Sequence, residues 1–271
     1  MNSLEILTTA RKNGYAIGAF NCINLETIAA IVAAAELENK AIILQISENA
    51  ARYAGLEELF AIAKIKKDKS AVPIIIHFDH AESYSSAKRA IDLGFDSVML
   101  ESAKLEPKEN LEQLKKISDY AKGKNVMIEG EFEITSKGTR SGQQLSAPEI
   151  AEMVNKSGSE LVAIDIGSKH KMTTKEASLD LEHLQDIAKL VSNPLVLHGA
   201  SGVSKAELQQ AIKLGITKVN VATELMLSFS NAIRQELSNP DIYDARKYLA
   251  RAQAAMQEKV REIIRLLQLE S

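Results

Sequence analysis

PLVLHGASGVSKAELQQAIKLGITKVNVAT, residues 194–223, is the stretch that decides the fold. It begins with a short apolar run at 194–199 that is typical of a buried strand, and a second such run follows at 218–223. Between them, apolar residues recur at three- and four-residue spacing from Ser204, a good N-cap, to Gly215, a good C-cap. The stretch is therefore expected to form two buried strands joined by an amphipathic helix.

The same pattern runs along the rest of the chain. Strands are predicted at 15–20, 41–47, 72–78, 97–101, 126–132, 161–167, 194–199 and 218–223. Helices are predicted at 24–39, 55–69, 83–94, 107–123, 147–158, 180–191, 204–215 and 224–237, with Asn24 and Ser83 as further N-caps and Gly94 and Gly158 as further C-caps.

Eight strands, each followed by a helix, favour an α/β fold of the closed (β/α)8 TIM barrel type over an open doubly wound sheet. No GxGxxG turn follows the first strand, which argues against a dinucleotide-binding half. We expect a single barrel domain over residues 1–271, with 241–271 as a C-terminal helical extension. The apolar stripe of this extra helix predicts a cover over the barrel or a subunit contact.

The composition is that of an ordinary globular protein, with 45% hydrophobic and 25% charged residues. Lys and Arg number 33 against 36 Asp and Glu, and a formal charge of −3 offers no basic surface for nucleic acid. No apolar run approaches the roughly 20 residues that span a bilayer. The one cysteine, Cys22, excludes an internal disulfide and suits a reducing compartment. We expect a cytoplasmic protein that binds neither nucleic acid nor membrane.

Three histidines stand where an apolar run ends, namely His80, His170 and His198. The carboxyl ends of the strands of a barrel meet at one end, where the chemistry of this fold lies. Three imidazole ligands with an open fourth position are typical of a catalytic zinc, so the sequence predicts a metalloenzyme. The alternative is that each is an isolated, hydrogen-bonded histidine.

Other polar residues are expected at the same end of the barrel. They are Asn21, Gln45, Ser47, Asp79, Glu101, Glu129, Glu131, Asn220 and Thr223. The remaining histidines, His77 within a strand and His183 on a helix, are interpreted as structural.

Several segments together resemble class II, zinc-dependent ketose-bisphosphate aldolases, nearest the tagatose-bisphosphate branch. They are AFNCINLETIAAIVAAAE (19–36), ILQISENAARYAG (43–55), HFDHAESYSSAKRAIDLGFDSVMLE (77–101), the opening stretch 194–223 continued to Leu225, and DARKYL (244–249). The resemblance covers nearly the whole chain. Its motifs DH (79–80), HGASG (198–202) and NVATEL (220–225) are specific in combination.

The resemblance implies a lyase of carbohydrate metabolism. Such an enzyme reversibly cleaves a phosphorylated ketose, such as tagatose or fructose 1,6-bisphosphate, to dihydroxyacetone phosphate and an aldehyde phosphate. His80, His170 and His198 would be the Zn²⁺ ligands, and Asp79 the acid/base at the aldehyde oxygen. Glu101 and Glu131 would form a second metal position, and the resemblance also admits a monovalent cation. A homodimer or homotetramer is expected.

The resemblance also places a phosphate of the substrate on two adjacent loops. One holds Gly199, Ala200 and Ser201, and the other holds Asn220, Val221, Ala222 and Thr223. Small residues and a helix N-terminus after the last strand offer backbone N–H groups to a dianion, which agrees with that placement.

Some positions depart from the family pattern. Lys171 replaces a glycine after the second zinc histidine, and Glu101 replaces an aspartate. The segment 129–149, EGEFEITSKGTRSGQQLSAPE, contains no clear counterpart of the glutamate that shuttles a proton in the family, and Glu133 lies too close to the strand.

Lys137, Arg140 and Lys171 make the same region basic, and Lys171 is expected to contact the substrate. This suggests a changed anionic substrate. Two alternatives stay open: an aldolase for a deoxy or otherwise modified sugar phosphate, and a homologue that binds metal and sugar phosphate without turnover.

Overall fold

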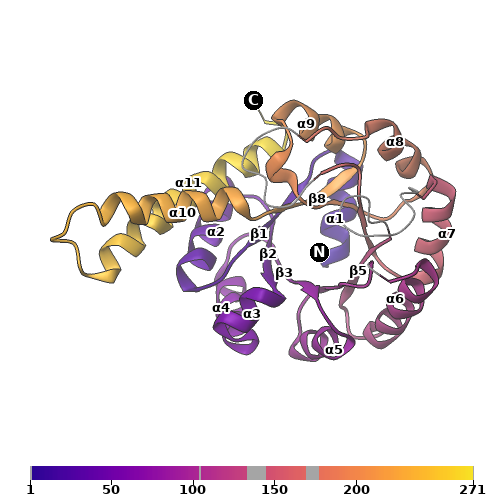
Figure 1. Cartoon of the computed structure of the whole chain (residues 1–271), viewed down its shortest axis with the longest axis horizontal. Helices are drawn as coiled ribbons and strands as arrows, with labels where there is room; N and C mark the ends of the chain where they lie inside the picture. Colours follow the sequence, from indigo (N-terminus) through magenta and orange to yellow (C-terminus); the bar gives the residue numbers. More distant parts are fainter. Residues whose placement is uncertain (1, 104, 133–144, 169–176, 271) are drawn as a thin grey trace.

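The computed structural model describes residues 2–103, 105–132, 145–168 and 177–270. Its eight parallel strands close into one barrel in chain order, with the last strand paired to the first (Figure 1). They are β1 Ile17–Asn21, β2 Ile42–Ser47, β3 Ile74–Ala81, β4 Ser97–Leu100, β5 Met127–Glu131, β6 Leu161–Ile164, β7 Leu195–Leu197 and β8 Ile216–Val221. The predicted TIM barrel is confirmed, and each predicted strand is present.

Helices follow the strands and form the outer ring (Figure 1). They are α2 Leu25–Glu38, α3 Glu48–Ala54, α4 Leu56–Lys69, α5 Tyr84–Leu93, α6 Pro107–Ala121, α7 Ala147–Ser157, α8 Leu181–Leu190, the 3-10 helix η1 Ala200–Gly202, α9 Lys205–Lys213 and α10 Thr223–Glu236. Each of the predicted N-caps Asn24, Ser83 and Ser204 accepts a hydrogen bond from a backbone N–H of the first turn.

Two of the predicted C-caps are confirmed and one is wrong. Gly94 and Gly158 end their helices in the left-handed conformation. The cap of α9 is Leu214, in the right-handed conformation, and Gly215 follows it with φ 123°. The difference arises because α9 ends at Lys213, before the predicted boundary, and the chain enters β8 directly after Gly215.

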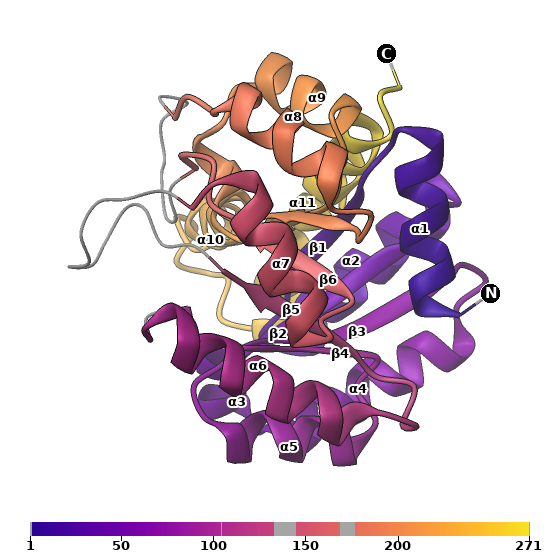
Figure 2. The ribbon, with the colours of Figure 1, turned by 90° about the vertical axis from the view of Figure 1, so that its right-hand side faces the viewer.

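Helix α1, Ser3–Asn13, and the short α3 are not among the helices predicted above. A capping box between Asn2 and Glu5 starts α1. Its apolar residues Ile6, Leu7 and Ala10 pack into an interior cluster with strand residues Ile17, Ala19, Ile43, Ile75, Met127, Leu161, Ala163 and Val196. Helix α1 thereby closes one end of the barrel, as the side view shows (Figure 2).

Alternation along the strands divides the barrel interior into an apolar and a polar part. On β3, Ile74, Ile76 and Phe78 belong to the core between barrel and helices, whereas Ile75 belongs to the interior cluster near α1. His77 and Asp79 continue the inward-facing row beyond Ile75 toward the carboxyl end. The polar side chains of the strands therefore lie on the end of the barrel opposite α1.

Helix α11, Ala245–Leu267, runs back along α10 and forms the predicted extra C-terminal helix. The hairpin of α10 and α11 extends beyond the barrel (Figure 1). The predicted stripe is buried at Ala252, Met256, Val260, Ile263 and Leu267, and α11 packs against α2 as well as α10. This helix thus covers one side of the barrel. None of the helices in the described part of the chain is both long enough and apolar enough to cross a membrane.

Candidate active site

Asp79 and His80 are neighbours in sequence, and both reach the same end of the barrel interior. Strict alternation on β3 would send His80 outward once Asp79 points inward. His80 instead has φ 52°, the left-handed region, and the pairing of β3 with β4 shifts register between Phe78 and Ala81. This unusual backbone lets the two side chains approach, with Nε2 of His80 3.8 Å from Oδ1 of Asp79.

His80 is oriented by a carboxylate from the next strand. Its Nδ1 donates a hydrogen bond to Oε2 of Glu101, which follows β4. Burial lowers the pKa of His80, but Asp79 and Glu101 outweigh burial and raise that pKa to about 10. The surroundings of His80 therefore stabilise positive charge.

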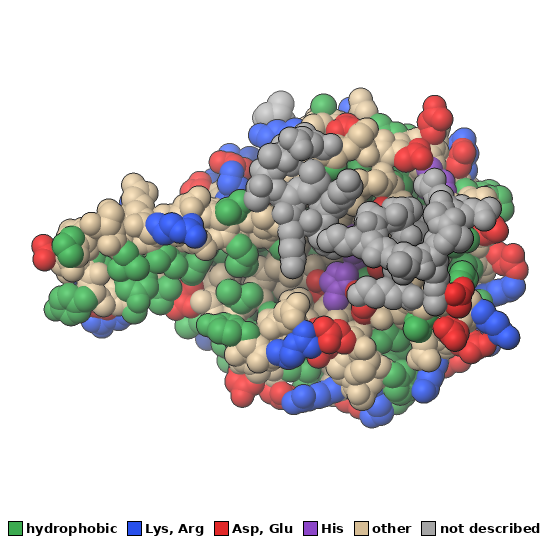
Figure 3. Space-filling view, in the orientation of Figure 1, with side chains coloured by type: hydrophobic (Ala, Val, Ile, Leu, Met, Phe, Trp, Pro, Cys, Tyr) green, Lys and Arg blue, Asp and Glu red, His purple; other side chains and the backbone are tan. Residues whose placement is uncertain are grey.

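His198, directly after β7, is oriented in the same manner from β5. Its Nε2 donates a hydrogen bond of 2.9 Å to Oε1 of Glu129, and its Nδ1 lies 3.8 Å from Oε1 of Glu131. The rings of His198 and His80 pack edge to face with centroids 5.3 Å apart. The space-filling view shows histidine beside acidic side chains near the middle of this face (Figure 3).

Asp79 is almost fully buried, at 3% exposure. Burial alone would raise the pKa of Asp79, but the neighbouring rings of His80 and His77 hold it well below its usual range. Within the described residues, Oδ1 of Asp79 has no hydrogen-bond partner. An ionised, buried carboxylate oxygen without a hydrogen-bond partner is poised to accept a proton or hydrogen bond from a bound molecule.

His77 lies beneath Asp79 and is fully buried. Its Nε2 lies 3.7 Å from Oδ1 of Asp79 and 3.8 Å from Oε2 of Glu129. Its Nδ1 is 2.9 Å from Oγ of Ser97. Because Nε2 faces two carboxylates, that nitrogen carries the proton, and the Ser97 hydroxyl donates to Nδ1. Burial lowers the pKa of His77, which keeps the ring neutral.

The predicted zinc ligands are His80, His170 and His198, and the described residues include two of them, His80 and His198. His170 and Lys171 lie outside the described residues, as do Glu133, Lys137 and Arg140. Among the residues described, no group of three His, Cys, Asp or Glu side chains is arranged to hold a metal. His80 and His198 nevertheless each use one ring nitrogen to donate to a carboxylate, the usual outer contact of a metal-bound histidine. His80 and His198 therefore make the outer contacts of metal ligands, while the described residues alone do not form a complete metal site.

One of the two segments predicted to hold phosphate follows β7, and the other spans the end of β8 and the start of α10. Gly199 has φ 65°, which favours glycine, and it leads into η1 at Ala200. Helix α10 begins at Thr223, and its N-cap Ala222 makes no side-chain hydrogen bond to the first turn. Oδ1 of Asn220 has no partner among the described residues. These groups offer N–H donors and one side-chain acceptor beside the histidines.

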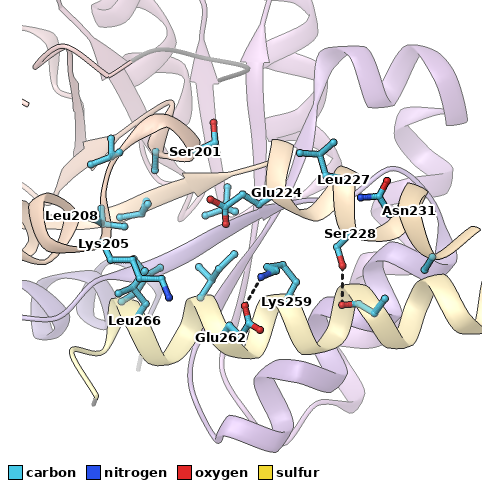
Figure 4. Close-up of a pocket in the computed structure, with 18 of the residues that line it drawn as sticks. Ser201, Lys205, Leu208, Glu224, Leu227, Ser228, Asn231, Lys259, Glu262 and Leu266 are labelled. Atoms are coloured by element: carbon cyan, nitrogen blue, oxygen red, sulfur yellow. Dashed lines mark hydrogen bonds and ion pairs between the residues drawn. The ribbon is translucent and has the colours of Figure 1, made fainter. Parts of the chain in front are cut away.

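A separate cavity of about 650 Å³ lies among α9, α10 and α11 (Figure 4). Val219 and Val221 line it, and both belong to the core outside the barrel rather than to its interior. Ala200 and Ser201, which are predicted to hold phosphate, also line this cavity, but none of the described histidines does. We therefore assign the chemistry to the barrel end and not to this cavity.

Comparison with known proteins identifies the family. The family model described as fructose-bisphosphate aldolase class-II matches residues 1–271. The chain belongs to the class II fructose-bisphosphate aldolase family. The enzyme is accordingly an aldolase, a lyase of carbohydrate metabolism, in a family that is generally metal-dependent.

Relatives and solved structures agree with this membership. The aldolase is 36% identical to the fructose-bisphosphate aldolase of Staphylococcus epidermidis, over 96% of this chain and 94% of that protein. It is 37% identical to the probable fructose-bisphosphate aldolase of Bacillus subtilis, over 94% and 93% of the two chains. Its structure is similar to that of the YdjI aldolase from Escherichia coli K12, with a TM-score of 0.87, 26% identity, and coverage of 98% and 96%. A putative fructose-1,6-bisphosphate aldolase from Coccidioides immitis gives a TM-score of 0.89, 28% identity and the same coverage.

Sequence reasoning missed the part of the site that lies deeper in the barrel. Lys218 of β8 is fully buried and pairs with Glu129, with Nζ 2.7 Å from Oε2. Burial alone would raise the pKa of Glu129, but Lys218, His77 and His198 hold it below its usual range. The sequence does contain one signal for this ion pair, because Lys218 lies inside a predicted buried strand and a lysine is almost never buried without a partner.

Proposed function

We propose that this aldolase is zinc-dependent and reversibly cleaves a phosphorylated ketose to dihydroxyacetone phosphate and an aldehyde phosphate. Two observations carry the proposal. His80 and His198 each donate a hydrogen bond to a carboxylate, and beside them a buried oxygen of Asp79 has no hydrogen-bond partner among the described residues. Family membership supports the reaction class.

The residues assigned to Zn²⁺ are His80, His198 and His170. Zn²⁺ bound there would supply a Lewis acid, which would polarise the ketose carbonyl and stabilise the negative charge left by cleavage of the C3–C4 bond. Acidic residues around the histidines favour a cation at this position, and we propose Glu101 and Glu131 as a second metal position. Burial raises the pKa of Glu131, which a cation would lower again.

Asp79 is proposed to hold the proton of the C4 oxygen. In the cleavage direction its carboxylate takes the proton from the C4 hydroxyl, and in the condensation direction it returns that proton to the aldehyde oxygen. Its lowered pKa supplies the ionised form that cleavage requires. The side chain is fixed by burial and by His77 beneath it, so the carboxylate needs little reorganisation.

A phosphate of the substrate is proposed to bind Gly199, Ala200 and Ser201 together with the turn Asn220, Val221, Ala222 and Thr223. The left-handed Gly199 and the N-terminus of α10, which lacks a side-chain cap, support this placement. Lys171 is proposed to contact the substrate anion directly. Because the family has a glycine at this position, an aldolase for a deoxy or otherwise modified sugar phosphate is the alternative to tagatose or fructose 1,6-bisphosphate.

The test combines metal removal with a substrate screen. Dialysis against a chelator should abolish release of dihydroxyacetone phosphate, and Zn²⁺ should restore it; undiminished cleavage by metal-free protein would refute the zinc assignment. Tagatose 1,6-bisphosphate, fructose 1,6-bisphosphate and deoxy analogues are then compared by kcat/KM. In Lys171→Gly the preference should change by at least tenfold, about 1.4 kcal/mol. Binding of dihydroxyacetone phosphate without proton exchange at C3 would instead indicate a homologue without turnover.

We also propose that the aldolase is a homodimer or homotetramer. The hairpin of α10 and α11 carries exposed apolar side chains, with Leu237 46% and Tyr243 90% exposed. Sedimentation of the wild type and of Leu237→Ser/Tyr243→Ser tests this proposal. The wild type should sediment as an oligomer and the variant as smaller species, whereas a monomeric wild type would contradict it.

A further inference from the structure

A fully buried ion pair crosses the barrel interior beneath the histidines. Lys218 and Glu129 approach to 2.7 Å, and neither side chain is exposed to solvent. They lie on β8 and β5, which are not neighbours in the barrel, so the pair spans its interior. The other carboxylate oxygen of Glu129 accepts the hydrogen bond from Nε2 of His198, which directly follows β7.

Stability alone does not account for this pair. Removing two charges from water costs several kcal/mol per ion, and well-packed apolar residues of similar volume often serve a core equally well or better. The same barrel uses such residues one layer toward α1, where Ile43, Ile75 and Met127 fill its interior. Charged side chains appear in the barrel interior only at the next layer, where Lys218 and Glu129 lie close to the histidines.

The hydrogen bond between His198 and Glu129 indicates what the ion pair does. A carboxylate accepts but does not donate, so Nε2 of His198 is the protonated nitrogen and Nδ1 is left as the basic one. Nδ1 faces the acidic end of the barrel, 3.8 Å from Glu131. Without Lys218, Glu129 would lose the contact that fixes its second oxygen, and the direction of its first oxygen toward His198 would no longer be set.

We propose that Lys218 is a positioning residue, which acts through Glu129 to fix the ring and tautomer of His198 so that Nδ1 faces the metal position. The proposal rests on the function proposed above for the presence and identity of a metal at His198. Neither Lys218 nor Glu129 touches metal or substrate in this role. His77, on β3, contacts the same carboxylate. Its Nε2 lies 3.8 Å from Oε2 of Glu129, which restricts the movement of Glu129.

Two variants test the role. Lys218→Met removes the charge and keeps most of the side-chain length. The double variant Lys218→Met/Glu129→Gln leaves no unpaired buried charge, so it preserves folding where the single change does not. Lys67→Met is the control. Lys67 also pairs with a carboxylate, 2.5 Å from Asp96, which precedes β4, but this pair is only partly buried and does not contact His198.

Two measurements avoid dependence on turnover. Zinc affinity is measured by competition with a chromophoric chelator, and the protonated ring nitrogen of each histidine is identified by ¹⁵N–¹H spectra of metal-free protein. The chain has 5 histidines, so His198→Gln assigns the His198 signals by difference. In wild type, His198 should be protonated at Nε2 alone.

In both Lys218 variants, zinc affinity should fall at least tenfold, as it does when outer contacts of metal ligands are lost, and His198 should show mixed tautomers. Lys67→Met should lower stability while leaving both readouts unchanged. Wild-type affinity and a single Nε2-protonated form in either folded Lys218 variant would overturn the proposal. If wild type failed to bind zinc, the proposed function would fail, and the tautomer spectra would still decide the role of Lys218.

Discussion

Ser168 donates a hydrogen bond of 2.6 Å from its hydroxyl to the backbone carbonyl oxygen of His198. The bond joins the segment after β6 to the end of β7, and Ser168 stands two positions before His170 in the sequence. Because Ser168 is only 9% exposed, water does not readily replace its hydroxyl. The bond therefore holds together two segments that carry proposed zinc ligands.

Replacing Ser168 with Ala should weaken zinc binding. We expect a loss of about tenfold in affinity, the lower end of the effect of outer contacts on a metal site, with a stability loss of roughly 1 kcal/mol for the missing hydrogen bond. Chelator competition and thermal unfolding measure the two effects. Ser228→Ala is the control, because Ser228 donates a similar bond of 3.0 Å to Ala255 between α10 and α11. Equal zinc affinity in the two variants would contradict the role of Ser168.

Asp79→Asn should keep the metal and lose cleavage. The amide has nearly the same shape but cannot take a proton from the C4 hydroxyl, so kcat should fall by about 10²- to 10⁴-fold, the usual contribution of a general acid or base. Metal content by elemental analysis and cleavage kinetics are measured on the same preparation. A variant that lost zinc yet turned over normally when resaturated would place Asp79 at the metal instead.

The barrel could be predicted from sequence because its signals are local. Each strand is a short apolar run, and caps such as Asn24 and Ser83 make their contacts within one turn. Asp79, His80 and His198 could be placed at one end of the barrel because each closes such a run. Helix α1 was missed although Asn2 and Glu5 form a capping box, a local signal that was available.

The deeper layer of the site could not be predicted because its contacts are long-range. Lys218 and Glu129 are 89 residues apart, and only closure of the barrel brings them together. The direction of His80 depends on a left-handed φ of 52° at a residue that is not glycine. Alternation along β3 predicts the opposite direction, so the approach of His80 to Asp79 is a property of the folded backbone rather than of the pattern.

Glu101→Gln should also weaken zinc binding. Glu101 accepts the Nδ1 hydrogen bond of His80, and a neutral amide is a poorer acceptor that can also turn its NH₂ group toward the ring. We expect about a tenfold loss of zinc affinity at neutral pH, measured by chelator competition. Glu57→Gln, which removes an exposed pair with Arg89, is the control and should leave affinity unchanged. If Glu101→Gln lowered the affinity only for a second, more weakly bound zinc ion, Glu101 would instead belong to the second metal position.

The pairing of α2 with α11 predicts a pH-dependent stability. Oε2 of Glu38 lies 2.8 Å from Nε of Arg265, and Oε1 lies 2.6 Å from Nε of Arg261. The hydrogen bond from Arg265, followed by that from Arg261, holds the pKa of Glu38 below its usual value. A lowered folded-state pKa contributes stability that is fully present above the pKa of an unfolded glutamate, about 4.3, and is lost as pH falls through the folded-state pKa.

Glu38→Gln should therefore lower Tm at neutral pH by about 2–4 °C, the shift expected for a modest loss of stability in a chain of this size. The difference from wild type should stay constant down to about pH 5 and shrink below about pH 4.3, where Glu38 of the unfolded chain takes up a proton while Glu38 of the folded protein is still ionised. Calorimetry from pH 8 to pH 3.5 measures it. Glu258→Gln removes an exposed carboxylate that contacts the same Arg261 within α11, at 3.0 Å, and should change Tm little at any pH. A Tm difference for Glu38→Gln that did not narrow in acid would show that the side chain stabilises by packing and not by its charge.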